Sequence, residues 1–462
     1  MTLATRARAA AVELAAFCGS LRWPDLPVDA RERTKELVLD LLGVAVRGSA
    51  AESSRAVQTF VRTQPDGRAT VLGTGLRTGA PWAAIANAAA AHATEMDDVT
   101  RESSLHPGVA VIPAALAVAQ ERRASAPAFL EAVVAGYEVT MRVGNALGPA
   151  SAYERGFHPT GVAGAFGAAV AAGRLAGLDR DGLVRAIGIA GTMASGSLEY
   201  LADGSWTKRL NPGWAGHAGI VAAGLAATGF TGPASALDGR FGLLRGYTDA
   251  PRPELLLADL GRPLQVMKVT IKPYACCRYT HGLIDGVLEL RRAHRIHPED
   301  VERIRLGVLR AGVLLIAEPI ERKRAPANVV DAQFSAPFGA AVALVHGRAG
   351  LAEHSDGVLA DPVVRSLMER TDCVGDASLD ADYPATWPAT VEILLRDGRS
   401  LSTRIEYALG EPERPVPRET LLERFVSMVA ERLDETSARD LAGRILRLDE
   451  ERDLNAVVRG LG

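Results

Sequence analysis

Runs of small apolar residues with helical spacing dominate the first 265 residues of the chain. Alanine and glycine fill most of these runs, and proline or glycine separates one run from the next at distances typical of short helix–helix connections. The predicted helices are residues 34–47, 81–94, 109–121, 127–146, 160–176, 182–197 and 213–228, after an amphipathic helix near the N-terminus. Because small side chains let helices approach closely, this part is predicted to be an all-helical domain.

The pattern changes near residue 265, where β-branched residues begin to alternate with polar ones. The predicted strands are residues 266–274, 301–309 and the two halves of 390–407, with helix candidates at 280–294 and 329–346. Asp397-Gly398 joins the two halves of 390–407, and this dipeptide is a strong hairpin signal. Beyond it, helical spacing returns, with charges at i and i+4.

These changes predict a mainly α fold with two domains. The large all-helical domain spans residues 1–266 and is completed by 410–462, and a smaller α+β lid domain, 267–409, is inserted before the C-terminal helices. A chain of 462 residues is long enough for two or three domains.

Charge and hydropathy exclude two classes of partner. The net charge of −3 comes from interspersed acids and bases, without the basic run or stripe of a nucleic-acid-binding protein. No apolar stretch reaches the roughly twenty unbroken residues that a bilayer requires. The four cysteines make no CxxC pair. We therefore expect a cytoplasmic protein with neither nucleic acid nor membrane as a partner.

Three segments repeat a polar residue, a proline and a nearby glycine ahead of a small-residue run. The polar residues are His106, His158 and Asn211, which are 52 and 53 positions apart (158−106, 211−158). Proline is favoured in the first turn of a helix, so each segment predicts a helix N-terminus, with Lys208 just before the third. Helix N-termini attract anions, so three converging ones would hold a small polycarboxylate. The alternative is three ordinary helix starts.

The densest polar cluster is HATEMDDVTRESSLHPG, residues 92–108. It crowds Glu95, Asp97, Asp98, Arg101 and His106 into one connection, where neighbouring groups can tune each other's pKa for acid–base catalysis. Alternatively, the aspartates end a helix or pair with Arg101. Asp97 and Asp98 with a histidine could in principle bind a divalent cation, but no HExxH or EF-hand spacing is present, so we expect no metal.

A second polar group lies at the expected boundary between the domains, where ligands often bind. It comprises Lys272, Arg278, Tyr279 and His281. The alternative is a strand followed by a helix cap with solvated charges. No GxGxxG, GxxxxGK[ST] or GxSxG motif supports a nucleotide site or an acyl-enzyme.

Several blocks, in the same order along nearly the whole chain, resemble the MmgE/PrpD family. They are HATEMDDVTRESSLHPGVAVIPAALAVA, GYEVTMRVG, GFHPTGVAGAFGAA, TKRLNPGWAGHAGIVAAGLAATGFTGP, KPYACCRYTHGLID and AQFSAPFGAA. The family includes enzymes that dehydrate 2-methylcitrate, decarboxylate cis-aconitate or epimerise iminodisuccinate. The resemblance implies a large helical domain, an α+β lid, a homodimer and a cofactor-independent active site between the domains.

The resemblance also assigns site residues. The matching positions are Glu95, Asp97 or Asp98, His106, His158, Lys208 and Lys272, with Arg278 and His281 nearby.

The chain departs from the family pattern in several places. Asn211 stands where relatives often have histidine, and Glu95 where they often have aspartate. The segment LLIAEPIERKRAPANVV lacks a tyrosine that the decarboxylases use, and the connection between Asp98 and His106 is one residue longer than theirs. The last two departures weaken the decarboxylase interpretation.

We therefore predict a cofactor-independent lyase that removes a proton α to a carboxylate of a small di- or tricarboxylate. Either His106 or His158 would take the proton, and the other, or Asp97, would protonate the leaving hydroxyl. The lysines would stabilise the developing charge. The predicted catalytic residues are Asp97, His106, His158, Lys208 and Lys272, and the predicted substrate-binding residues are Glu95, Asp98, Arg278, Tyr279 and His281.

A hydro-lyase resembling 2-methylcitrate dehydratase is the first choice among the reactions. Epimerisation of a substituted succinate comes second, and decarboxylation of the cis-aconitate type also uses a stabilised anion. Outside these reactions stands a non-catalytic carboxylate-binding dimer, since a fold alone does not imply activity.

Overall fold

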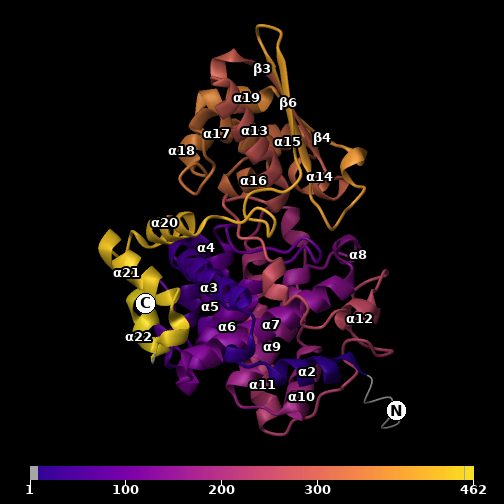
Figure 1. Ribbon diagram of the computed structural model, residues 1–462, viewed down its shortest axis with the longest axis vertical. Coiled ribbons are helices and arrows are strands. Elements are labelled where there is room, and N and C mark those ends of the chain that lie inside the picture. The colour runs from indigo at the N-terminus through magenta and orange to yellow at the C-terminus, as the bar shows by residue number, and fades with distance from the viewer. Residues whose placement is uncertain (1–8, 452) are drawn as a thin grey trace. The chain divides into compact units, whose positions relative to one another are not determined.

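The computed structural model describes residues 9–451 and 453–462, which form two compact units (Figure 1). Unit 1 comprises Met1–Ala93, Asp97–Val269 and Pro417–Gly462, and unit 2 comprises Thr94–Met96 and Thr270–Val416. The domain limits expected from the sequence were residues 266 and 410. The three-residue segment Thr94–Met96, in the middle of the acidic connection, belongs to unit 2.

Unit 1 is built almost entirely of helices. Its helices of ten or more residues before the chain enters unit 2 for the second time are α2 (Ala10–Ser20), α3 (Val28–Gly48), α4 (Glu52–Val61), α5 (Ala80–His92), α6 (Pro107–Arg122), α7 (Ala126–Leu147), α9 (Pro159–Leu175), α10 (Arg180–Ala190) and α11 (Thr207–Ala227). Besides 3₁₀ turns, the shorter elements are α8 (Pro149–Glu154), α12 (Leu243–Gly246) and the two-residue strands β1 (Ala69–Thr70) and β2 (Arg77–Thr78). After unit 2, the chain returns as α20 (Arg418–Val429), α21 (Glu435–Ile445) and α22 (Leu454–Val458).

Helix α9 lies at the centre of unit 1 and packs against α6, α7, α10 and α11. Small residues make this packing possible: a Cβ added at Gly164 of α9 would lie 2.7 Å from Ala110 Cβ on α6 and 3.3 Å from Ala215 Cβ on α11. The predicted mainly α fold with close helix packing is therefore confirmed. Among the described residues, no helix is both long and apolar enough to cross a membrane.

The three proline motifs do not all begin helices. Helix α6 begins at Pro107 with His106 as its N-cap, and α9 begins at Pro159 with His158 as its N-cap, as predicted. The third prediction is wrong, because α11 begins at Thr207 and Pro212 lies inside it. A helix can contain a proline when packing compensates for the one lost hydrogen bond. Lys208 is therefore in the first turn of α11 rather than ahead of the helix.

Unit 2 contains a four-stranded sheet in the order β4-β3-β5-β6. The strands are β3 (Val301–Val308), β4 (Thr371–Gly375), β5 (Ala389–Leu395) and β6 (Ser400–Ile405). Strand β5 pairs antiparallel with β3 and β6, and β4 pairs parallel with β3. The predicted hairpin is confirmed, with Gly398 in the left-handed region at φ 88°.

The helices of unit 2 pack on this sheet or on one another. They are α13 (His281–His294), α14 (Arg310–Ile316), α15 (Ile320–Arg324), α16 (Val329–Gln333), α17 (Ala336–His346), α18 (Asp356–Leu359) and α19 (Pro362–Glu369). The alternate residues of β5 that face inward, such as Val391 and Ile393, are buried, and α13 brings Gly286 close to Val391. Sheet and helices therefore share one core.

Three element predictions need correction, one at the end of the long middle segment of unit 1 and two in unit 2. Residues 266–274 hold a 3₁₀ turn at Gln265–Lys268 instead of a strand. The single helix expected at 329–346 is two helices, because Ser335 caps α17 by accepting from Phe338 N at 3.0 Å. Strand β4 was missed, because five residues with polar Thr371 and Asp372 give too short a pattern, and pairing with β3 defines the strand.

Candidate active site

Side chains from four places in unit 1 lie near His92 and its partner Asp97. His92 is the last residue of α5, His106 and His158 are the N-caps of α6 and α9, and Lys208 is in the first turn of α11. The His92 ring centroid lies 4.9 Å from that of His106 and 6.0 Å from that of His158. The charge of Lys208 also acts on His92. Unit 1 alone thus brings together four of the five predicted catalytic residues.

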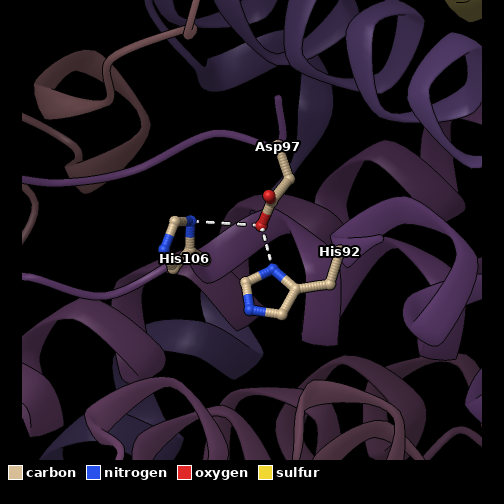
Figure 2. Close-up of side chains that lie close together, drawn as sticks. All are labelled: His92, Asp97 and His106. Atoms are coloured by element: carbon tan, nitrogen blue, oxygen red, sulfur yellow. Dashed lines mark hydrogen bonds and ion pairs between the residues drawn. The ribbon is translucent and has the colours of Figure 1, made fainter. Parts of the chain in front are cut away.

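Asp97 is fully buried and is shared by two histidines (Figure 2). Its Oδ2 lies 2.8 Å from His92 Nδ1 and 3.1 Å from His106 Nδ1. An ionised carboxylate can only accept, so each ring donates from Nδ1 and keeps a lone pair on Nε2. Burial lowers the pKa of His92 to about 4, with Lys208 adding to the decrease against the opposing pull of Asp97. His92 is therefore neutral near pH 7.

His106 is positioned from both of its ends. Its Nδ1 lies 2.8 Å from the backbone oxygen of Asp98, in addition to its contact with Asp97, and its backbone N donates to Thr160 Oγ1 at 3.1 Å. The side chain is 12% exposed, whereas His92 and Asp97 are fully buried. Two acceptors at Nδ1 hold the ring so that Nε2 carries the lone pair. This arrangement resembles the orientation of a catalytic base by a carboxylate.

Asp98 fixes the start of α6. Its Oδ1 accepts from Gly108 N at 3.0 Å, and its Oδ2 accepts from the Tyr137 hydroxyl at 2.6 Å. A Cβ at residue 108 would lie 2.3 Å from the Tyr137 hydroxyl, so only glycine fits here. Burial raises the pKa of Asp98 to about 7, although the hydrogen bond from Tyr137 opposes the increase. Its substrate-binding role stays a prediction, and these contacts support a positioning role.

His158 is buried beside the loop that follows α10. Its Nδ1 lies 3.2 Å from Asn211 Nδ2, and its ring lies edge-on to Tyr200 at 6.0 Å. Asn211 Nδ2 also donates to the Ser197 carbonyl at 3.2 Å. Asn211 and Ser197 line an open cavity of about 890 Å³ in unit 1. Asn211, where the family resemblance led us to expect a histidine, is thus in direct contact with a predicted catalytic histidine.

The remaining predicted residues lie in unit 2. Lys272 is fully buried with Nζ 3.6 Å from Glu95 Oε2, and Gln333 Nε2 donates to Thr94 O at 3.2 Å. Glu95 has φ 55°, which is uncommon for a residue with a side chain and is found most often at functional sites and tight turns. The pair is a second buried charge centre. The catalytic role of Lys272 and the substrate-binding role of Glu95 stay predictions.

Arg278, Tyr279 and His281 take part in the packing of unit 2. Arg278 forms an ion pair with Glu411, and Tyr279 stacks on Trp387 at 4.2 Å. His281 Nε2 lies 3.3 Å from the Cys276 carbonyl. The alternative of solvated charges is wrong here, because all three predicted residues are buried. Their substrate-binding roles stay predictions.

The sequence reasoning missed His92 and Thr160. The only signal for His92 was its place at the end of a small-residue helix, five positions before Asp97. Thr160 contacts His106 across 54 positions of sequence, a contact without a local signal.

His92, Asp97 and His106 offer ligand atoms within 4.8 Å of one another, the one such group found among residues 9–451 and 453–462. Two imidazoles and a carboxylate suit zinc or iron. The separations of 2.8 and 3.1 Å, however, are those of hydrogen bonds, and a proton on each Nδ1 accounts for both. The geometry therefore gives no reason to require a metal.

Comparison with known proteins finds similarity over most of the chain. The MmgE/PrpD N-terminal domain matches residues 12–256, and the MmgE/PrpD C-terminal domain matches residues 274–450. A cis-aconitate decarboxylase of Aspergillus terreus is 29% identical, over 96% of this chain and 94% of its own length. The human cis-aconitate decarboxylase is 26% identical, over 92% and 89%. A mitochondrial 2-methylcitrate dehydratase of Yarrowia lipolytica is 27% identical, over 30% and 27%. The chain belongs to the MmgE/PrpD family.

Proposed function

We propose that this chain, a lyase of the MmgE/PrpD family, acts without a cofactor on a small tricarboxylate by removing a proton α to a carboxylate. One observation carries the proposal: His106 is held by Asp97 with its Nε2 lone pair available, and a second histidine and a lysine lie in the same cluster. A base, a hydrogen-bonding ring and a cation are what the reaction needs.

All atoms and electrons of the dehydration come from the substrate itself. The C–H bond α to a carboxylate breaks, its proton goes to a histidine, and its electron pair moves into the carboxylate to give an aci-carboxylate. Lys208 stabilises the added negative charge. The pair then forms a carbon–carbon double bond as the hydroxyl group leaves with a proton, and the products are an unsaturated tricarboxylate and water.

Dehydration of a hydroxy tricarboxylate of the 2-methylcitrate kind is the first candidate, because it uses a base such as His106. Decarboxylation of cis-aconitate is the second candidate, and the names of the relatives that match over 92–96% of the chain favour it. In decarboxylation, a C–C bond breaks instead, carbon dioxide leaves, and the resulting carbanion takes a proton. Lys208 would stabilise both anions.

Lys272, beside Glu95, is assigned a role in holding a substrate carboxylate. Glu95 is one anionic partner of this fully buried lysine, and a substrate carboxylate would be a second one. This role is separate from that of the histidines, so Lys272→Met is expected to raise KM more than it lowers kcat.

The proposal includes a homodimer in the cytoplasm. Leu210, Trp214 and Leu225 lie on one face of α11 and are 37–40% exposed, which supports a protein contact there. Sedimentation of the purified chain, with Trp214→Lys as the variant, tests the dimer. Cell fractionation tests the compartment.

Proton NMR in heavy water separates the reactions. The purified chain is incubated with 2-methylcitrate, citrate, cis-aconitate and substituted succinates. A new vinyl signal from a hydroxy acid means dehydration, a new methylene signal from cis-aconitate means decarboxylation, and deuterium at an inverted α carbon means epimerisation. Binding detected by calorimetry without any reaction would contradict the lyase and favour a carboxylate-binding protein.

A further inference from the structure

We propose that Asn211 is a positioning residue that holds His158 in the tautomer with its proton on Nε2, so that His158 is a hydrogen-bond donor to the substrate anion and His106 alone carries the proton. This inference rests on the proposed function and deepens it. It assigns different roles to two histidines that the sequence leaves interchangeable.

The contact with Ser197 fixes the orientation of the Asn211 amide. Its Nδ2 lies 3.2 Å from the backbone carbonyl of Ser197. A carbonyl oxygen can only accept a hydrogen bond, so the atom facing it must be the NH₂ group rather than the amide oxygen. The usual ambiguity between the two ends of an asparagine side chain is thereby removed.

The Ser197 carbonyl is itself fixed relative to His158. Phe157 and Ser197 form an antiparallel bridge, and His158 N donates to Gly196 O at 3.0 Å. Gly161, in the first turn of α9, allows the close approach, because a Cβ there would lie 2.5 Å from Ser195 O. The backbone therefore sets the place of the carbonyl that orients Asn211.

The same NH₂ group of Asn211 determines the tautomer of His158. Its nitrogen also lies 3.2 Å from His158 Nδ1, and an amide nitrogen can only donate. One hydrogen goes to Ser197 O and the other to His158, so Nδ1 must be an acceptor and carry no proton. In a neutral ring the proton is then on Nε2. A proton on both nitrogens is disfavoured, because Nδ1–H would face the Asn211 hydrogens.

His106 is in the opposite state. Its Nδ1 faces only acceptors, the Asp98 carbonyl at 2.8 Å and the Asp97 carboxylate at 3.1 Å, so Nδ1 carries the proton and Nε2 the lone pair. When Nε2 takes a proton from the substrate, Asp97 stabilises the resulting imidazolium. His158 Nδ1 instead accepts from Asn211, so the ring would have to become an imidazolate to give its Nε2 proton away.

The two rings therefore divide the reaction. His106 takes the proton from the α carbon and later delivers it to the leaving hydroxyl, so that water forms and His106 returns to its neutral state. His158 Nε2–H donates a hydrogen bond to the carboxylate oxygen on which charge develops. Removing a donor of this kind entirely lowers kcat by a factor of about 10²–10³.

Nitrogen-15 NMR of the histidine-labelled full-length chain tests the tautomer without a substrate. The His158 signals are assigned from their loss in His158→Gln. His217 is the internal reference for the opposite tautomer, because its Nδ1 lies 3.2 Å from the Pro81 carbonyl and burial lowers its pKa. We expect the His158 proton on Nε2 in the unchanged chain, on Nδ1 in Asn211→Asp, and on both sites in exchange in Asn211→Leu, which has similar size and no donor.

Kinetics test the division of roles. Glutamine keeps an N–H donor but transfers no proton, so His158→Gln is expected to retain activity within about tenfold, whereas His106→Gln loses about 10²–10⁴ in kcat. A His158 proton on Nδ1 in the unchanged chain would overturn the inference whatever the activity. Equal losses in the two glutamine variants would overturn it as well. Full activity in both His106→Ala and His158→Ala, with the tautomers as stated, would instead contradict the proposed function.

Discussion

Two groups of buried side chains, one in each unit, are arranged in different ways. In unit 1, one carboxylate, Asp97, serves both His92 and His106, and each ring directs only one nitrogen to it. In unit 2, Arg278 pairs with Glu411 and Tyr274 donates to Asp285. A buried pair with matched charges mainly preserves the fold, whereas a shared carboxylate orients nitrogens that still have chemistry to perform. Substitutions in these two groups should therefore change different quantities.

The largest expected effect is on turnover in unit 1. His106→Gln should lower kcat by about 10²–10⁴, because it removes the base without removing bulk. It should change the melting temperature little, since the ring is partly exposed. Steady-state kinetics and thermal unfolding measure both, with His217→Gln as the control outside the cluster. Normal turnover in His106→Gln would end the contrast between the units.

The next effect is on stability in unit 2. Arg278→Met leaves the Glu411 carboxylate buried without its arginine, and should lower the free energy of unfolding by about 3–5 kcal/mol. The double variant Arg278→Met with Glu411→Met should recover much of the loss. Denaturant titration measures both. A rise in KM at unchanged stability would instead place Arg278 at the substrate, as the sequence suggested.

A third variant probes the backbone next to the cluster. Gly108→Ala places a Cβ 2.3 Å from the Tyr137 hydroxyl and should destabilise the chain by about 1–3 kcal/mol. Gly224→Ala is the matched control, because Gly224 is on the exposed side of α11 with open space around it and should gain up to about 1 kcal/mol. Equal stabilities of the two variants would show that Asp98 and Tyr137 leave room for a Cβ at the start of α6.

The pH dependence of stability gives a smaller effect. The folded state raises the Asp98 pKa from 3.8 to about 7, so it holds a proton that the unfolded chain releases. This group therefore makes the chain less stable as pH rises between about 4 and 7. Asp98→Asn lacks the titration, so its stability relative to the unchanged chain should increase across this window. If the difference in free energy of unfolding between Asp98→Asn and the unchanged chain stayed constant across this window, the raised pKa of the Asp98 carboxyl would be contradicted.

The smallest expected effect is that of chelation. Because hydrogen bonds account for the contacts among His92, Asp97 and His106, dialysis against EDTA should leave kcat and stability unchanged. Activity lost on dialysis and regained with zinc or iron would identify the group as a metal centre. It would also end its assignment as a proton-transfer cluster.

The sequence predicted those parts of the site that depend on local structure. His106-Pro107 and His158-Pro159 begin helices because proline suits a first turn, and both histidines became N-caps. The same reasoning failed at Pro212, since the packing of α11 tolerates a proline that local preference would put at its start. Local preference has no means of weighing that packing.

Contacts over long separations were out of reach. Asn211 meets His158 across 53 positions, and Thr160 meets His106 across 54, so only the folded chain brings them together. From the sequence, Asn211 was noted only as an asparagine where the family resemblance led us to expect a histidine. The structure shows that it is a donor at a histidine, which follows from the geometry of the Ser197 carbonyl.

The assignment of Thr94–Met96 to unit 2 affects how the chain can be divided into separately expressed fragments. A fragment spanning residues 270–416 would leave out Glu95, and with it the carboxylate beside the fully buried Lys272. Joining residue 93 directly to residue 97 would shorten the connection that carries Asp97 behind His92. Split expression, domain exchange with a relative and circular permutation should therefore keep residues 92–98 intact and take their breakpoints elsewhere.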